Sequence, residues 1–241
     1  MSGHIIDGNN LLPATGYLAL VWQTFGMIKG QIYKTLSIVF RDVNFIRAIY
    51  LSKNYAVNLK IAIQKGIKKV TLKHNHKNTY KRIYKNISDG KFEITEGDNV
   101  IVTGTVYETL NPEQEMIPTN LLLENNDEEE LMTAHDIYKE LKLRGYQYTD
   151  WFRGLKSASI SGKKGHIIWR NNWVTFMDSM LQMKLIGYDT RDLYVPTSIQ
   201  KIVINPVLHA WKLQDITDGG EVITDINKRN CSSITDYSSY R

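Results

Sequence analysis

Two polar residues interrupt an otherwise apolar stretch of sequence, WVTFMDSMLQMKLI at residues 173–186. Asp178 and Gln182 are four positions apart, so on a helix their side chains would emerge on one face. A carboxyl group among apolar neighbours loses hydration, which favours its neutral, proton-donating form. The spacing equally fits a face exposed to solvent, on which the two side chains would only continue a polar surface.

A histidine near the start of the chain could supply a complementary base. His4 begins the segment HIIDGNNLLP, in which Gly8 permits a tight turn and Pro13 sets the entry into an apolar helix. Backbone N–H groups at the start of such a helix can stabilise a developing oxyanion. An imidazole beside them could act as a general base near neutral pH, although a single histidine is also typical of an ordinary surface loop.

These residues need elements that bring them together, and the first half of the chain predicts one helix and several strands. Residues 14–28 have apolar side chains at helical spacing, with Thr15 as a possible N-cap. β-Branched, partly alternating sequence predicts strands within residues 36–51, 56–64 and 91–107.

The second half repeats this pattern. Helices are predicted at 132–144 and 173–186, each followed by a glycine, and extended segments at 166–169 and 193–204. The sequence therefore predicts an α+β fold in which a central apolar helix among strands occurs twice.

The composition between and after these units predicts the domain boundaries. Residues 111–130 contain two prolines and three adjacent glutamates without a strand pattern, as is typical of a linker. We therefore expect a first half at 1–107, a linker at 108–131, a second half at 132–215 and a polar tail at 216–241 that is irregular or truncated.

The composition fits a folded protein inside the cell. With 241 residues, 42% of them hydrophobic, and one cysteine, Cys231, the chain can bury a sizeable core and form no internal disulfide. The longest apolar stretch, residues 11–22, contains Pro13 and is shorter than the roughly 20 residues that cross a bilayer. No secretory leader is recognisable, so we expect a cytoplasmic protein without a membrane span.

Four motifs together resemble the dehydratase domain of animal fatty acid synthase and related polyketide synthases. HIIDGNNLLPATGY (4–17) is similar to the family's histidine motif HxxxGxxxxP, and NNWVTFMDSMLQ (171–182) to its aspartate motif. YKELKLRGYQY (138–148) resembles the segment leading into GYxYGPxF, and LYVPTSI (193–199) the LPxx stretch. The motifs follow the family's order over most of the chain. The resemblance implies a double hot-dog fold, in which each half wraps a curved antiparallel sheet around its central helix.

The resemblance also implies a reaction. Family chemistry removes water from a 3-hydroxyacyl thioester, carried on the phosphopantetheine arm of an acyl carrier protein, to give the trans-2-enoyl thioester. His4 would take the α-proton, and Asp178, aided by Gln182, would protonate the leaving hydroxyl group. The alternative is an impaired or non-catalytic hot-dog module that binds acyl chains or is structural within a larger synthase.

The substrate-binding residues implied by the family motifs are Gly8, Pro13, Ala14, Tyr146 and Tyr148. Because side chains perform both proton transfers, no metal or organic cofactor is expected. The implied partners are the acyl carrier protein, the acyl thioester and the other domains of a synthase that is a homodimer.

Two features depart from the family pattern. Thr149-Asp150 replaces the family's Gly-Pro, which alters a turn near the substrate and adds a charge there. The net charge of +5 arises in residues 65–85, where lysines and one arginine occur without an acid. Within this region, residues 67–88 resemble an insertion.

This insertion could be a solvated loop or a gene-model artefact, or it could dock an acidic carrier protein. Tyr80 and Tyr84 among its lysines also fit a nucleic-acid-binding loop, the less favoured reading. Its HNH triplet at 74–76 has no cysteine or acid nearby, so no metal site is expected there.

Overall fold

The computed structural model describes residues 2–52, 54, 56–65, 73–74, 80–81, 89–115, 131–214, 222–225 and 231–239, and every structural statement below concerns these residues. Residues 116–130 of the expected linker, most of the basic segment at 67–88, and residues 216–221, 226–230 and 240–241 of the tail lie outside them. Within the basic segment, β5 (Lys73–His74) pairs with β6 (Tyr80–Lys81).

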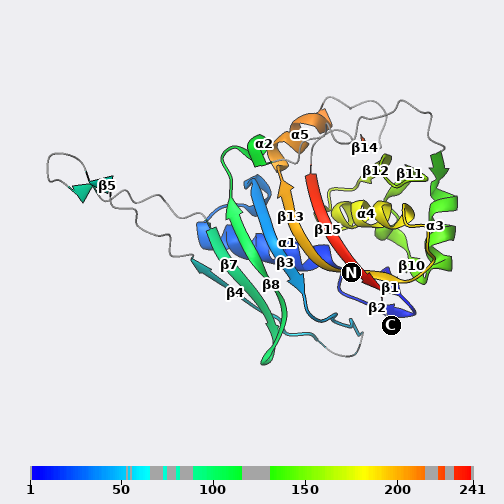
Figure 1. The fold of residues 1–241 in the computed structure, drawn as a ribbon, viewed down its shortest axis with the longest axis horizontal. Coiled ribbons are helices and arrows are strands. Elements are labelled where there is room, and N and C mark those ends of the chain that lie inside the picture. Colours follow the sequence, from blue (N-terminus) through cyan, green and yellow to red (C-terminus); the bar gives the residue numbers. More distant parts are fainter. Residues whose placement is uncertain are drawn as a thin grey trace.

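The largest sheet has six antiparallel strands in the order β15-β13-β3-β8-β7-β4, with helix α1 (Ala14–Lys29) across one face (Figure 1). β-Branched and aromatic residues, which suit a pleated and half-buried surface, supply its central strands. Its strands are β3 (Ile38–Phe45), β4 (Lys60–Lys65), β7 (Asp89–Glu96), β8 (Asn99–Glu108), β13 (Tyr194–Ile204) and β15 (Cys231–Ser239).

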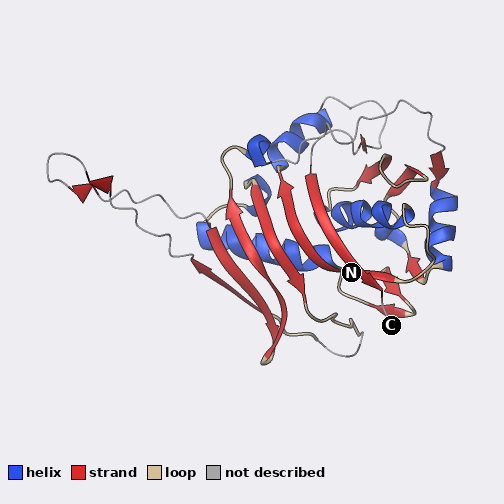
Figure 2. Ribbon diagram, in the orientation of Figure 1, coloured by secondary structure: helices blue, strands red, loops and turns tan. Residues whose placement is uncertain are grey.

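A second antiparallel sheet, in the order β14-β12-β11-β9, lies beside helix α4 (Trp173–Ile186), which contacts β11 and β12 (Figures 1 and 2). Its strands are β9 (Leu131–Thr133), β11 (Leu155–Ser159), β12 (Gly165–Trp169) and β14 (Val222–Asp225). The remaining helices are α2 (Pro112–Glu115), α3 (Ala134–Leu143), α5 (Pro206–Gln214) and the 3-10 turns η1 (Tyr33–Thr35) and η3 (Asp150–Phe152).

A small third sheet joins the start of the chain to its second half. Strand β1 (His4–Ile6) pairs on one side with β2 (Asn9–Asn10) and on the other with β10 (Tyr146–Tyr148). The β1–β2 turn consists of Asp7 and Gly8, which both have positive φ, 46° and 75°. Positive φ at both central residues is the requirement of a two-residue type I′ hairpin, and Asp-Gly is a favoured sequence for it.

Helices α1 and α4 form the centre of the core because both are apolar almost all round, as buried helices are. They contact each other directly: Thr15 Oγ1 donates to the carbonyl oxygen of Val174, 3.0 Å away, and the Trp22 and Trp173 rings meet edge to face at 5.5 Å. Thr15 was expected to cap α1, but the N-cap is Pro13 without a side-chain hydrogen bond. The hydroxyl group of Thr15 joins the two helices instead.

The six-stranded sheet combines strands from both expected halves of the chain. β13, within residues 132–215, pairs with β3, for example Ile202 with Phe40. The tail, expected to be irregular or truncated, is not irregular at residues 222–225 and 231–239, which form β14 and β15. These strands pair with the edges of β12 and β13, which are distant in sequence, so a local pattern could not reveal them.

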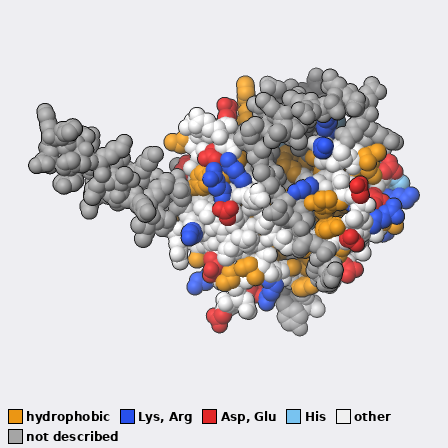
Figure 3. Space-filling view, viewed as in Figure 1, with side chains coloured by type: hydrophobic (Ala, Val, Ile, Leu, Met, Phe, Trp, Pro, Cys, Tyr) orange, Lys and Arg blue, Asp and Glu red, His pale blue; other side chains and the backbone are white. Residues whose placement is uncertain are grey.

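On the face shown in Figure 3, the described lysine and arginine side chains lie among acidic ones. No helix in the described part of the chain is both long and apolar enough to span a bilayer.

Candidate active site

The hairpin at the start of the chain holds His4 in one orientation. The turn brings Leu11 back beside His4, so that Leu11 N–H donates to the His4 carbonyl oxygen at 3.1 Å. The Nδ1 atom of His4 lies 3.0 Å from the Leu11 carbonyl oxygen, which can only accept a hydrogen bond. Nδ1 therefore carries the proton in the neutral ring, and the lone pair is on Nε2. The buried ring contacts those of Tyr148 and Phe152, whose centroids are 5.5 and 5.2 Å away.

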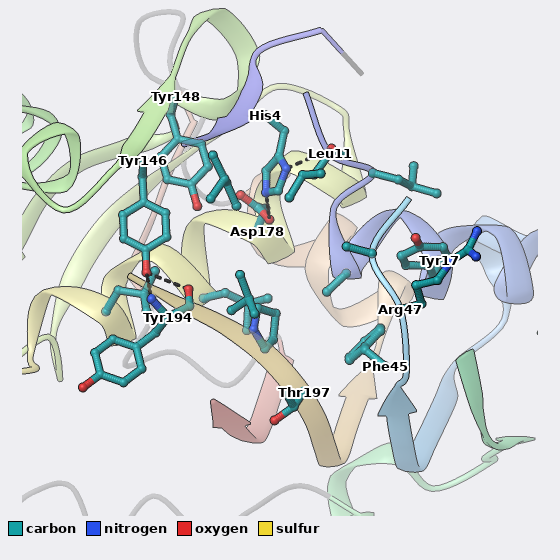
Figure 4. A pocket seen from close by; sticks show the side chains of 18 of the residues that line it. His4, Leu11, Tyr17, Phe45, Arg47, Tyr146, Tyr148, Asp178, Tyr194 and Thr197 are labelled. Atoms are coloured by element: carbon teal, nitrogen blue, oxygen red, sulfur yellow. Dashed lines mark hydrogen bonds and ion pairs between the residues drawn. The ribbon is translucent and has the colours of Figure 1, made fainter. Parts of the chain in front are cut away.

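Asp178 faces this imidazole from α4 (Figure 4). Its Oδ1 is 3.6 Å from Nε2 of His4, and its exposed fraction is 3%. Burial raises the pKa of the Asp178 carboxyl group above its ordinary value, and this effect exceeds the opposing influence of His4 and of the hydrogen bond from Gln182. The alternative that this helix face is solvated is wrong, since Asp178 and Gln182 are both buried.

Gln182 connects Asp178 to the surrounding backbone. Its Nε2 donates to Asp178 Oδ2 at 2.7 Å and to the Phe152 carbonyl oxygen at 2.9 Å. Its Oε1 accepts from the hydroxyl group of Tyr138, which lies on α3, at 3.1 Å. The amide thus positions one oxygen of the carboxyl group and leaves the other on the side of His4.

His4 and Asp178 line a cavity of about 250 Å³ that is mostly apolar. Three of the expected substrate-binding residues, Ala14, Tyr146 and Tyr148, also line it. Its apolar wall comes from several elements and consists of Ile6, Leu11, Leu12, Phe45, Ile46, Leu181, Leu185, Val195 and Pro196. Figure 4 shows Tyr17, Phe45 and Arg47 on the side of the cavity away from Tyr146.

Three expected site residues do not line the cavity. Gln182 lies behind Asp178 and donates to its Oδ2. Gly8 is exposed at the hairpin turn, where its N–H donates to Gln147 Oε1 at 2.8 Å. Pro13 is the N-cap of α1 and has no N–H to offer, so it determines where the helix begins rather than contacting the cavity.

The two tyrosines of β10 form one wall of the cavity. Their rings are stacked, with centroids 5.8 Å apart. The hydroxyl group of Tyr146 donates to the Tyr194 carbonyl oxygen at 2.6 Å and accepts from the Tyr194 N–H at 2.7 Å. Burial raises the pKa of Tyr146 to about 12, so this hydroxyl group stays protonated and joins β10 to the start of β13.

The comparisons with solved structures identify this fold. The dehydratase domain from the CurF module of curacin polyketide synthase aligns with a TM-score of 0.64 at 15% identity, covering 99% of this chain and 88% of that one. The dehydratase domain of RzxB from Pseudomonas fluorescens aligns with a TM-score of 0.60 at 12% identity, covering 85% and 73%. The chain has the polyketide synthase dehydratase fold. The predicted double hot-dog architecture is thereby confirmed.

Sequence comparison points to much longer proteins. The hybrid PKS-NRPS synthetase phm1 of Pyrenochaetopsis sp is 23% identical over 224 residues, and the hybrid PKS-NRPS synthetase tasS of Hapsidospora irregularis is 26% identical over 229 residues. Each match covers 86% of this chain and 5% of the synthetase, so the chain spans a small part of either protein. No family model matches the chain.

The altered turn of this dehydratase fold lies outside the cavity. Asp150, expected to add a charge near the substrate, is exposed and starts η3 with a positive φ of 51°. A proline cannot adopt that φ, so the backbone here suits Asp and not the Pro of the family pattern. Neither Thr149 nor Asp150 lines the cavity.

Sequence reasoning missed four residues that shape this site. Tyr138 and Phe152 contact Gln182, Tyr194 holds Tyr146, and Arg47 lines the cavity while paired with Glu96. Phe152 stands where the motif GYxYGPxF ends in Phe, which was the available signal. The others depend on contacts between elements distant in sequence. In the described ranges, no three His, Cys, Asp or Glu side chains form a group that could hold a metal ion.

Proposed function

We propose that this chain is the dehydratase domain of a multidomain synthase. It would convert a 3-hydroxyacyl thioester to the trans-2-enoyl thioester and water. The observation that supports this most directly is the pairing, at one cavity, of an unprotonated imidazole nitrogen with a buried carboxyl group whose pKa is raised. A base and an acid are what the removal of water requires.

His4 is the proposed base. Its Nε2 removes the α-proton of the thioester, and the Leu11 carbonyl oxygen stabilises the resulting imidazolium by accepting the Nδ1–H bond. Negative charge that develops on the thioester oxygen would be met by the two amides that open the first turn of α1, those of Ala14 and Thr15, which have no acceptor within the helix. Ala14, in that turn, lines the cavity.

Asp178 is the proposed acid. Its Oδ2 accepts the Gln182 N–H, so the proton of the neutral acid is available on Oδ1, toward the cavity and His4. This proton joins the leaving hydroxyl group as the Cβ–O bond breaks, the Cα–Cβ double bond forms and water departs. Transfer of the proton gained by His4 to Asp178 then restores both groups for the next cycle.

The setting of the reaction is part of the proposal. The substrate would arrive on the phosphopantetheine arm of an acyl carrier protein, and the other domains of a homodimeric synthase in the cytoplasm would be further partners. The relatives and neighbours described above belong to polyketide-type synthases, which favours a role in polyketide synthesis. A role in fatty acid synthesis stays a prediction. The proposed proton transfers need no metal or organic cofactor.

The test is turnover by the purified chain of a 3-hydroxybutyryl pantetheine thioester, with enoyl thioester formation and the reverse hydration both measured. His4→Ala and Asp178→Asn should lower kcat/KM by about 10²–10⁴-fold while circular dichroism stays unchanged. The matched controls His135→Gln and Asp98→Asn alter exposed side chains and should leave the rate unchanged.

Two results would reject the proposal: a near wild-type rate for either site variant, or no turnover by a folded wild-type chain. Binding of the acyl thioester without turnover would support the non-catalytic module instead.

A further inference from the structure

Within the proposed dehydration, on which this inference rests, we propose that Tyr138 is a positioning residue for the acid. Its hydroxyl group holds the Gln182 amide in one orientation, and that amide in turn orients the carboxyl group of Asp178. Tyr138 does not line the cavity, so its effect on the reaction would pass entirely through Gln182.

The hydroxyl group of Tyr138 is fixed from two sides. The Leu155 N–H, at the start of β11, donates to the tyrosine oxygen at 2.9 Å. The single proton of the hydroxyl group can then go to Gln182 Oε1 at 3.1 Å or to the Phe152 carbonyl oxygen at 3.5 Å. The shorter contact has the better hydrogen-bond geometry, and the Phe152 oxygen already accepts from Gln182.

This arrangement permits only one orientation of the Gln182 amide. The Phe152 carbonyl oxygen accepts and cannot donate, so Nε2 must face it, and Oε1 must face the donor Tyr138. The reversed amide would bring Oε1 against the Phe152 oxygen and remove the donor from Asp178 Oδ2. The second N–H of Gln182 is thereby directed to Oδ2.

The surroundings keep Tyr138 protonated and in place. Burial raises the pKa of its hydroxyl group well above the ordinary value, so it remains a donor throughout the working pH range. The Arg153 guanidinium carbon lies 4.7 Å from the centre of its ring. Tyr138 and Arg153 line a surface groove, separate from the cavity, together with residues of α3 and β10. Tyr138 therefore extends from this groove to the hydrogen bonds around Asp178.

Loss of the hydroxyl group should change Asp178 in a defined direction. The Gln182 hydrogen bond lowers the pKa of Asp178 by stabilising its carboxylate form. An amide free to rotate would make this bond less often, so the pKa of Asp178 should rise further in Tyr138→Phe. The acid must be neutral to act, so the alkaline limb of the pH–rate profile should move to higher pH, while kcat falls roughly tenfold and KM stays constant.

The experiment measures kcat, KM and the pH–rate profile for wild type, Tyr138→Phe, Gln182→Ala and the double variant. Because Tyr138 acts through Gln182, adding Tyr138→Phe to Gln182→Ala should change neither kcat nor the alkaline limb further. Tyr33→Phe, which removes a hydroxyl group beside Trp22 and away from the cavity, is the matched control and should keep wild-type values.

A second readout does not depend on turnover. Carbon-13 NMR of labelled aspartate, with the signal assigned by its loss in Asp178→Asn, follows the titration of Asp178 directly. An upward shift of this titration in folded Tyr138→Phe supports the inference, and an unchanged titration overturns it. An unchanged titration together with wild-type turnover would reject only the role of Tyr138, whereas absence of turnover in the wild type would reject the proposed dehydration separately.

Discussion

The Nε2 atom of His4 and the Oδ1 atom of Asp178 lie 3.6 Å apart, although one residue precedes the first long helix and the other is in the middle of α4. The gap is longer than a hydrogen bond. Each group is instead held from behind, His4 by the Leu11 carbonyl oxygen and Asp178 by Gln182. Nε2 and Oδ1 therefore face each other beside the cavity that both residues line.

Replacing the buried acid should change how stability depends on pH. Because burial raises the pKa of Asp178, the folded protein holds this proton more tightly than the unfolded chain does. The stability from this group is complete below the unfolded pKa of about 3.9 and is lost as the pH rises through the raised folded value. Asp178→Asn escapes this loss, so its Tm should rise relative to wild type as the pH increases from about 4 toward the raised folded pKa.

Thermal unfolding of wild type and Asp178→Asn across that range measures the difference in Tm. The titration of all other groups affects both proteins alike and cancels in this difference. Asp98→Asn, an exposed substitution, serves as the control. A Tm difference that is constant or that declines with pH would contradict the expectation.

The hydrogen bond between α1 and α4 should contribute measurably to stability. Thr15→Val keeps the size of the side chain but removes the donor to the Val174 carbonyl oxygen. We expect a loss of about 1 kcal/mol, or roughly 2–4 °C in Tm. Thr24→Val is the control, since Thr24 Oγ1 bonds only within α1, to Leu20, and the side chain is partly exposed. Equal losses in the two variants would refute a special role for the contact between the helices.

A methyl group at Gly154 should displace the helix that carries the acid. A Cβ atom there would overlap Ser179 Oγ, one residue after Asp178, and lie 3.4 Å from Ser179 Cβ. Gly154→Ala should cost about 1–3 kcal/mol and reduce turnover. Ser179→Ala removes the overlapping atom, so the double variant should recover most of both losses. Denaturant unfolding of wild type, the two single variants and the double variant tests this. If the stability changes of the single variants simply add in the double variant, steric overlap is not the cause.

Loss of the Tyr146 hydroxyl group should loosen the cavity wall. Tyr146→Phe leaves both backbone groups of Tyr194 without their partner, which should cost about 1–3 kcal/mol. The residues that follow Tyr194 in β13 line the cavity, so KM should rise more than kcat falls. Thermal unfolding and steady-state kinetics measure both effects. A variant with wild-type Tm and KM would show that the two hydrogen bonds between the Tyr146 hydroxyl group and the Tyr194 backbone are dispensable.

The helices were predictable because their signals are local. The structure places α1 and α4 within one residue of the predicted bounds, 14–28 and 173–186. The face on which Asp178 lies was not predictable from spacing, because a helix buried on nearly all sides has no polar face for comparison. Only the four motifs together placed Asp178 near His4.

The short strands and the tail were beyond local reasoning. β10 has three residues, and its pairing with β1 depends on contacts across most of the chain. The same holds for β15 and β13. Tyr138 stands in a recognisable motif, yet its role requires knowing that Leu155, Phe152 and Gln182 surround its hydroxyl group.

The pairing of β1 with β10 means that neither end of the chain contains a whole site. A break between Glu115 and Leu131 would leave His4 on one fragment and Asp178 on the other, while β3 and β13 would have to meet across the break. Two such fragments, expressed separately and mixed, would act as a complementation pair. Any turnover in the mixture would report their association, and neither fragment alone would produce a signal.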